Sequence, residues 1–148
     1  MKIKDFLSPS DVAADVSASD KGDLLRELAA RAASAVSLSA SAVVSEIERR
    51  DELGSTGLGG GIAIPHARFR EVKKPFGLLV RLKQPIDFQA IDGQPVDLVF
   101  LLLLPASSQL DQLNALAAVA RKLRDADVLR KLRGATSTTE LYRAVTEG

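Results

Sequence analysis

Apolar residues recur in two ways that alternate along this chain. In some stretches they come every three or four positions, which is typical of a helix with one buried face. In others they form short continuous runs bounded by glycine or proline, which is typical of a strand buried on both sides. The chain is therefore expected to combine helices and strands in an α/β fold.

The helical pattern predicts five helices. Serine and aspartate stand where helices are expected to begin, since their side-chain oxygens accept hydrogen bonds from the free N–H groups of a first turn. The expected helices run from Ser19 or Asp20 to about Val36, from Ser39 or Ser41 to Leu53 and Gly54, from Ser107 or Ser108 to about Arg124, from about Ala126 to Arg133, and from Ser137 onward. The apolar face of the third is expected to comprise Leu110, Leu113, Leu116, Ala117, Ala120 and Leu123.

The strand pattern marks residues 62–64, 76–82 and 96–104, with a short extended pairing near Val12 and Val16. Residues 96–104 form an apolar run interrupted only by Asp97, as in a strand covered on both faces. Between the strands we expect a charged loop at 68–74, a turn at 83–85 and an irregular segment at 86–91. Helices on both sides of one very apolar sheet predict a three-layer α/β sandwich.

Length and composition fit one domain, residues 1–148, because 148 residues with 46% hydrophobic content can bury a core. The longest strongly apolar run, 98–104, is far shorter than the roughly 20 residues of a membrane span. The N-terminus lacks a signal-peptide pattern. The absence of cysteine excludes disulfides and thiolate metal sites. A cytoplasmic protein without membrane insertion is expected.

Charge gives little reason to expect nucleic acid as a partner, because the net charge is only +1. A basic stretch at 121–133 is interrupted by leucines at helical spacing. A solvated amphipathic face explains it better than contact with nucleic acid or with an acidic partner. The two N-terminal helices carry no basic recognition set of the helix-turn-helix kind.

Candidate chemistry gathers in residues 54–67, which hold half of the ten glycines and the only histidine, His66. Glycine lets the main chain approach a ligand closely, and Pro65 fixes the backbone before His66. An imidazole on a rigid mount, beside a loop rich in N–H donors, suits a phosphoryl group better than a metal. No Lys-Ser/Thr pair follows the glycines, which excludes a Walker A loop. A histidine-dependent hydrolase is disfavoured because the chain has no nucleophile-elbow motif.

The residues in and around this stretch resemble a known family. Residues 50–57 (RDELGSTG) and 61–66 (GIAIPH), together with 92–100 and the turn at 104–106, are similar to enzyme IIA domains of the phosphotransferase system. Within the fructose/mannitol superfamily, the spelling GSTG is closest to the nitrogen-regulatory branch. The resemblance extends from residue 3 to residue 142, and it implies a mixed sheet with a reactive histidine at its edge.

The resemblance implies that His66 accepts a phosphoryl group on Nε2, with no metal or cofactor. It also implies that Arg50 lies near the phosphoryl group, although by itself Arg50 could be a solvated arginine at a helix end. Ser55 and Thr56 could bind phosphoryl oxygens or could be ordinary turn residues. We expect His66 to lie partly exposed in a shallow depression, walled by the glycine loop and the helix carrying Gln112, with an apolar rim.

Gln112 is a departure from the family, which usually has a second histidine before a leucine at this position. A side-chain amide can donate a hydrogen bond to a phosphoryl oxygen but cannot take up a proton. Asn114 is another possible substitute that the spacing does not favour. We therefore expect phosphoacceptance at His66 with Gln112 binding the phosphoryl group, and an altered rate or onward transfer.

The resulting hypothesis is a phosphocarrier of the nitrogen-regulatory type. It would receive its phosphoryl group from an HPr-like (NPr-type) carrier and regulate target proteins according to its phosphorylation state. One alternative is a sugar-transport IIA component that passes phosphate to a IIB domain. Another is a binding module in which phosphorylation is vestigial, an alternative that Gln112 keeps open.

Overall fold

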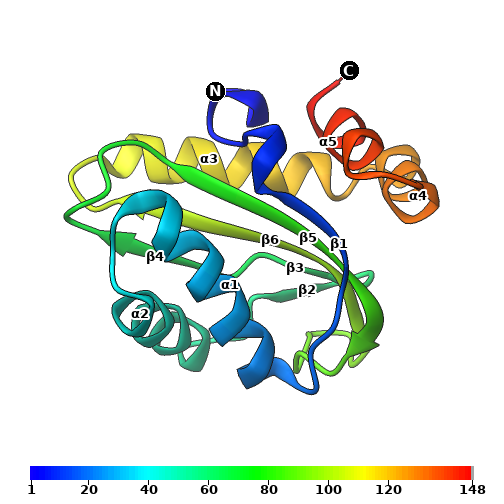
Figure 1. Ribbon diagram of the computed structural model, residues 1–148, viewed down its shortest axis with the longest axis horizontal. Coiled ribbons are helices and arrows are strands. Elements are labelled where there is room, and N and C mark those ends of the chain that lie inside the picture. Colours follow the sequence, from blue (N-terminus) through cyan, green and yellow to red (C-terminus); the bar gives the residue numbers. More distant parts are fainter. Residues whose placement is uncertain (148) are drawn as a thin grey trace.

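Strand β6 (Val96–Pro105) lies at the centre of a six-stranded mixed sheet in the computed structural model, which describes residues 1–147 (Figure 1). The other strands are β1 (Val12–Val16), β2 (Gly57–Gly59), β3 (Ile62–Ala63), β4 (His66–Phe69) and β5 (Phe76–Ile86). The helices are α1 (Lys21–Val36), α2 (Ala40–Glu52), α3 (Gln109–Lys122), α4 (Ala126–Gly134) and α5 (Thr138–Thr146), with 3₁₀ turns η1 (Ile3–Asp5) and η2 (Pro9–Asp11). The predicted domain includes Gly148, which lies outside the described residues.

The strand order is β1-β5-β6-β3-β2, with β4 also paired to β6. β5 runs antiparallel to β6, whereas β3 and β4 both run parallel to it along the same side. Ile62 lies opposite Leu98 and His66 lies opposite Leu102. Within the described residues β4 pairs only with β6, so His66 lies on a strand at the edge of the sheet. This arrangement confirms the predicted mixed sheet.

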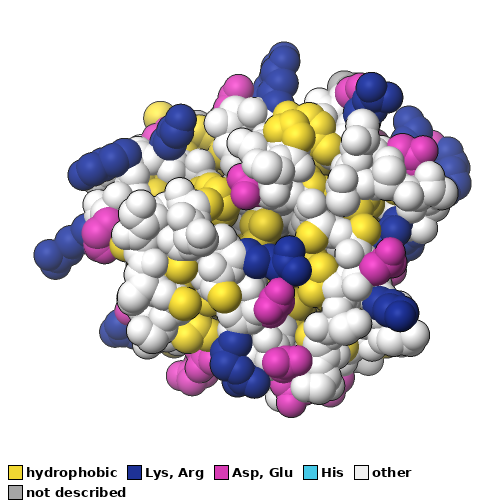
Figure 2. Space-filling view, in the orientation of Figure 1, with side chains coloured by type: hydrophobic (Ala, Val, Ile, Leu, Met, Phe, Trp, Pro, Cys, Tyr) yellow, Lys and Arg dark blue, Asp and Glu magenta, His cyan; other side chains and the backbone are white. Residues whose placement is uncertain are grey.

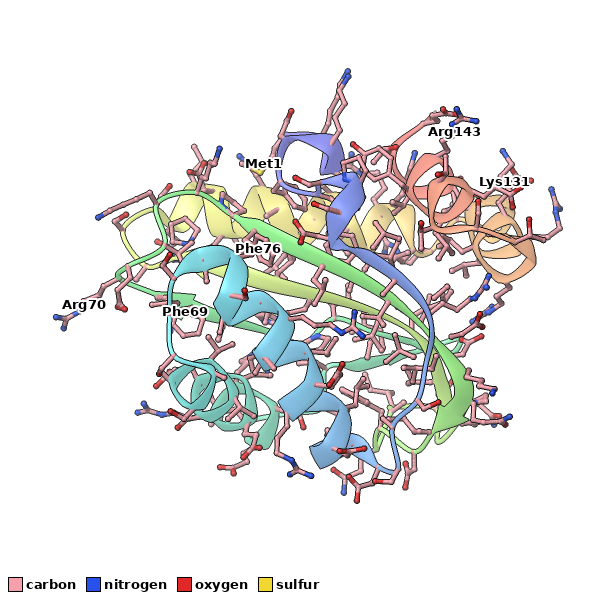
Figure 3. All side chains as sticks on the ribbon, in the orientation of Figure 1. Met1, Phe69, Arg70, Phe76, Lys131 and Arg143 are labelled. Atoms are coloured by element: carbon pink, nitrogen blue, oxygen red, sulfur yellow. The ribbon has the colours of Figure 1, made fainter. Side chains whose placement is uncertain are left out.

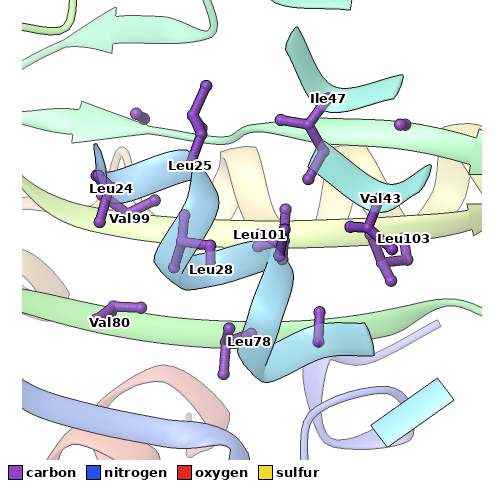
Figure 4. Packing of buried hydrophobic residues seen from close by; sticks show 14 of the residues in the cluster. Leu24, Leu25, Leu28, Val43, Ile47, Leu78, Val80, Val99, Leu101 and Leu103 are labelled. Atoms are coloured by element: carbon purple, nitrogen blue, oxygen red, sulfur yellow. The ribbon is translucent and has the colours of Figure 1, made fainter. Parts of the chain in front are cut away.

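Two apolar cores lie on opposite faces of the sheet. Side chains alternate along β6, so Val99, Leu101 and Leu103 face α1 and α2 (Figure 4). Leu98, Phe100, Leu102 and Leu104 face the core that includes side chains of α3, α4 and α5. Figure 1 shows α1 and α2 on one side of the sheet and the C-terminal helices on the other. The predicted three-layer α/β sandwich is confirmed.

The helix starts were predicted well because each has a capping side chain. Asp20, Ser39, Ser108, Asp125 and Ser137 each accept a hydrogen bond from a backbone N–H of the first turn that follows. The predicted strand at residues 62–64 and the pairing of Val12 and Val16 are also confirmed in outline. Within the described residues, no helix has the length and hydrophobicity needed to cross a membrane.

Two predictions about the loops are wrong. The expected turn at 83–85 is part of β5, which continues to Ile86. Val16, the last paired residue of β1, lies opposite Leu82 of β5. Pro85 therefore lies beyond the end of β1, where its missing N–H interrupts no hydrogen bond between these two strands. The expected loop at 68–74 begins inside β4, because Arg68 and Phe69 pair with the end of β6.

The predicted apolar face of α3 is also partly wrong. Leu110 and Leu113 are 67% and 60% exposed, while Ala115 and Val119 are fully buried. Both sets follow helical spacing, so periodicity alone cannot choose between them. Small side chains let a helix approach a close-packed sheet, and the leucines are left on the surface.

Candidate functional site

His66 begins β4, directly after Pro65, and is partly buried. Its Nδ1 lies 2.8 Å from the backbone carbonyl oxygen of Ile64. A carbonyl oxygen only accepts hydrogen bonds, so Nδ1 carries the proton and donates it. The neutral ring then has its lone pair on Nε2, for which the described residues provide no hydrogen-bond partner. The geometry therefore leaves Nε2 as the ring nitrogen with a free lone pair.

The surroundings keep this imidazole neutral. Burial lowers the pKa of His66 from its ordinary value of 6.5, and the positive charges of Arg50 and Arg68 lower it further. The carbonyl of Ile64 opposes these effects because it favours a protonated ring. The lowering prevails, so the pKa lies below 6.5 and the ring is mostly unprotonated near neutral pH.

This shift can be measured directly, because the chain has one histidine and hence one imidazole resonance set. We expect an NMR titration to give a pKa below 6.5, and we expect Arg68→Gln to raise it by removing a nearby positive charge. Because folding lowers the pKa of His66, the unfolded chain binds more protons than the folded chain as the pH falls below 6.5. His66 therefore lowers the free energy of unfolding as the pH falls through this range. A measured pKa above 6.5 would contradict a buried imidazole flanked by cations. Arg31→Gln on α1 removes the same charge from a residue outside the hollow and serves as the control, which should leave the pKa unchanged.

Arg50 lies in the last turn of α2 and reaches the same region. Its Nη1 donates a hydrogen bond to the carbonyl oxygen of Gly54, at 2.9 Å. A guanidinium has five N–H donors in a planar fork. One anchored donor therefore fixes the group and leaves others for an anion.

Arg50, His66 and Gln112 line one open hollow of about 1070 Å³. Its lining comes from α2, from β4 and the turn after it, and from α3 with the end of β6: Ala42, Ser45, Glu46, Arg49, Arg50, Leu53, His66, Ala67, Arg68, Phe69, Arg70, Glu71, Leu104, Ala106, Gln112 and Leu116. Four arginines and two glutamates among them make the hollow electropositive overall. In Figure 3, Phe69 points inward beneath the helices while Arg70 projects outward at this end of the sheet.

The glycine-rich turn does not wall the hollow, contrary to our expectation. None of residues 54–61 is part of the lining. Positive φ angles at Gly59, Gly60 and Gly61 instead form the tight turn between β2 and β3. His66 lies four residues farther along β6 than Ile62, roughly 13 Å away at the usual strand rise.

This turn is held by side chains remote from His66. Asp92 accepts a hydrogen bond from the N–H of Gly60, while Arg133 donates to the Gly60 carbonyl oxygen and pairs with Asp97. A methyl group on Gly61 would also clash with Arg133 and Asp97. The glycines therefore serve the hairpin and its contacts with α4 and β6.

Ser55 and Thr56 have internal hydrogen-bond partners. The Ser55 hydroxyl donates to the carbonyl oxygen of Phe88 at 3.1 Å, and the buried Thr56 hydroxyl donates to Asp51 at 2.9 Å. Neither residue lines the hollow. Their contacts hold the segment after α2 in place.

Gln112 lies in the first turn of α3 and lines the hollow. Its Nε2 donates to the Pro105 carbonyl oxygen at 2.9 Å, and the amide retains a second N–H. Asn114 is exposed and does not line the hollow. Gln112, which the sequence spacing favoured over Asn114, is therefore the one of the two that lies at the hollow with His66.

Arg68 is a residue of the site that the sequence analysis missed. It lies two residues after His66 on β4, and alternate strand residues share a face. Recognising that β4 continues past His66 would have revealed it. Where an apolar rim was expected, one large exposed apolar side chain lines the hollow: Leu53, which is 84% exposed.

The basic stretch at 121–133 belongs to another part of the molecule. Arg130 and Lys131 pair with Asp127, and Arg133 pairs with Asp97. Lys131 and Arg70 lie at opposite ends of the molecule (Figure 3). Basic and acidic side chains are interspersed over the face in Figure 2, as expected for an ordinary solvated surface. Within residues 1–147, no three His, Asp or Glu side chains gather as a metal site.

A three-layer α/β sandwich that presents one neutral imidazole, at the edge of its sheet, to a hollow lined by arginines defines a class of protein: a carrier domain for an anionic group. Comparison with known proteins agrees. The model of the phosphoenolpyruvate-dependent sugar phosphotransferase system EIIA 2 family matches residues 5–148. The chain therefore belongs to this family.

Individual relatives narrow the comparison. A nitrogen regulatory protein of Bradyrhizobium diazoefficiens is 44% identical over 142 residues, which cover 96% of this chain and 93% of the relative. The solved nitrogen regulatory protein IIA-Ntr from Neisseria meningitidis has a TM-score of 0.92 at 34% identity, covering 97% of this chain and 99% of its own. A fructose-specific EIIA component from Haloferax volcanii is 40% identical but covers only 68% of this chain and 65% of its own length.

These comparisons confirm the predicted resemblance to the nitrogen-regulatory branch of enzyme IIA. They support a phosphocarrier regulatory protein that works with phosphotransfer partners of the phosphotransferase system. The sugar-specific alternative fits less well, because the similarity to the fructose component covers less of the chain.

Proposed function

We propose that His66 accepts a phosphoryl group on Nε2 from an HPr-like (NPr-type) phosphohistidine carrier. The new N–P bond forms as the N–P bond of the donor breaks, and the donor imidazole departs with the electron pair of that bond. The single observation that carries this proposal is the hydrogen bond from Nδ1 to Ile64, which leaves the lone pair on Nε2. The Nδ1 proton stays in that bond throughout.

Three side chains lining the hollow suit the incoming group. Arg50 and Arg68 supply positive charge for the phosphoryl oxygens, and Gln112 supplies a neutral donor. Donors held in place before the reaction stabilise charge in the transition state without reorganising. Ser55 and Thr56 contribute through the segment that holds Arg50. No metal or cofactor is needed, because the donor already carries an activated phosphoryl group.

In this proposal residues 1–148 work as one cytoplasmic domain that regulates target proteins according to its phosphorylation state. The names of the relatives at 44% and 34% identity favour nitrogen regulation over sugar transport. Transfer of a phosphoryl group as PO3− to a neutral ring that keeps its Nδ1 proton changes the net charge by about −1 and adds three acceptor oxygens. That charge offsets part of the excess positive charge of the hollow, so the two states would present different surfaces to a partner.

The proposal is tested by incubating the protein with phosphoenolpyruvate and the general phosphotransferase proteins and measuring its intact mass. We expect a gain of one phosphoryl group that is labile in acid and stable in base, as a phosphoimidazole is. A protein that stays unmodified with every HPr-type donor, yet still binds its regulatory partners, would support the binding-module alternative.

Gln112 can be tested by two substitutions. Gln112→Ala removes a neutral hydrogen bond worth about 0.5–1.5 kcal/mol, so the transfer rate should fall roughly 2- to 13-fold. Gln112→His restores the usual residue of the family and should leave phosphoacceptance intact or faster. Rates are measured at saturating donor, with Asn114→Ala as the control on the same helix. If neither Gln112 variant changes the rate, this side chain does not contact the phosphoryl group.

A further inference from the structure

Asp51 is a carboxylate in an unfavourable position. It lies in the last turn of α2, where the partial negative charge of the helix C-terminus disfavours an acidic side chain. Its side chain is nevertheless only 11% exposed. A carboxylate so deeply placed needs charge pairing and hydrogen bonds to offset lost hydration. Its contacts therefore explain why it is there.

Both oxygens of Asp51 have partners. Oδ1 accepts hydrogen bonds from the backbone N–H of Thr56 at 3.0 Å and from its hydroxyl at 2.9 Å. Oδ2 forms an ion pair with Nζ of Lys21, in the first turn of α1. Lys21 in turn lies over the ring of Phe88, 4.7 Å from its centre. One carboxylate thus joins the start of α1, the end of α2 and the segment that follows α2.

That segment contains the anchor of Arg50. The Gly54 carbonyl oxygen accepts from Nη1 of Arg50, and the Gly54 N–H donates to the Asp51 carbonyl oxygen at 3.1 Å. Two residues later, Thr56 is held by the Asp51 side chain. The anchoring carbonyl is therefore fixed on both sides. A long arginine side chain has many rotamers, and a fixed acceptor restricts them.

We propose that Asp51 is a positioning residue. It holds residues 54–56 through Thr56, so that the Gly54 carbonyl keeps the Arg50 guanidinium beside His66. The effect on transfer rests on the proposed function, whereas the placement of Arg50 can be measured without any transfer. Thr56 then acts through its bond to Asp51, and not through a bond to the phosphoryl group.

The first test uses the His66 titration, measured by NMR, as a sensor of the Arg50 charge. Thr56→Val removes the hydroxyl with little change in volume and none in charge, and Thr56→Ser keeps the hydroxyl. We expect Thr56→Val to raise the His66 pKa by part of the amount that Arg50→Gln raises it, and Thr56→Ser to restore the wild-type pKa. The other charged groups around His66, namely Arg68, Glu46, Arg49, Arg70 and Glu71, are the same in all variants.

The second test measures phosphoryl transfer from phosphoramidate, a small donor that needs no protein docking. Thr56→Val and Asp51→Ala should each lower the maximal rate about 2- to 10-fold at unchanged half-saturation. In an Arg50→Ala background the same changes should have little further effect, because they act through Arg50. Thermal unfolding is used to check that each variant is folded. If Asp51→Ala does not fold, Thr56→Val alone tests the positioning role.

The outcomes separate the two proposals. Equal losses of rate in the wild-type and Arg50→Ala backgrounds would overturn the positioning role of Asp51. An unchanged His66 pKa in Thr56→Val would also overturn it, because it would show that Arg50 stays in place without the Thr56 hydroxyl. A wild-type protein that gains no phosphoryl group at His66 would instead overturn the proposed function, and the titration alone would then decide the role of Asp51.

Discussion

A His66→Ala variant is expected to gain no phosphoryl group when incubated with phosphoenolpyruvate and the general phosphotransferase proteins, whereas the wild-type protein is expected to gain one. The chain has no other histidine, so no second imidazole can replace the lost Nε2. The expected loss is complete within the sensitivity of intact-mass measurement. No other expected effect is as large.

The fold should survive this substitution. His66 lies on an edge strand, and its side-chain hydrogen bond goes to the nearby Ile64 carbonyl oxygen. Circular dichroism and thermal unfolding of His66→Ala should therefore resemble those of the wild type. A phosphoryl group that persists in His66→Ala and is stable in acid would locate the acceptor on a hydroxyl and would falsify the assignment.

Arg50→Ala should have the next largest effect, a fall of roughly 10- to 150-fold in the rate of phosphoryl gain at saturating donor. A hydrogen bond to a charged group is worth about 1.5–3 kcal/mol, and this factor follows if the contact acts fully in the transition state. Arg50→Lys should recover only part of the rate, because an ammonium group keeps the charge but lacks the planar fork.

A matched control separates this contact from net charge. Arg31→Ala removes the same charge from α1, on a residue that does not line the hollow. It should leave the rate unchanged. If Arg50→Ala transfers as fast as the wild type, Arg50 is an ordinary arginine at the end of a helix. In that case its bond to Gly54 only stabilises the end of α2.

The sequence predicted the features that depend on neighbouring residues. Helix starts at Asp20, Ser39 and Ser108 followed from side chains that cap their own first turns. The buried strand near residues 96–104 followed from the unbroken apolar run at 98–104. The family motif around His66 also lies within a short stretch. In each case the interaction, or the pattern, spans only a few residues.

The candidate site shows where this local reasoning stopped. The sequence pointed to His66, Arg50 and Gln112, and the structure brings all three to one hollow. The sequence contained no sign that Arg68 lines the hollow, because residues 68–74 resembled a charged loop. The sequence also suggested that the glycines near His66 would wall the site, although they form a hairpin turn near the start of β6, away from the strand position opposite His66.

By itself, then, the sequence determined which residues form most of the helices and strands, which family motif they carry and which side chain can be the nucleophile. The tertiary structure alone decided that Ala115 and Val119 of α3, and not Leu110 and Leu113, face the sheet. It also decided that Asp51 contacts Lys21, thirty residues earlier in the chain, as well as Thr56. Helical periodicity is the same for either face of α3, and an ion pair between distant residues leaves no periodic trace. Both depend on how separate elements pack, which is fixed only when the sheet and its two helical layers close over the cores.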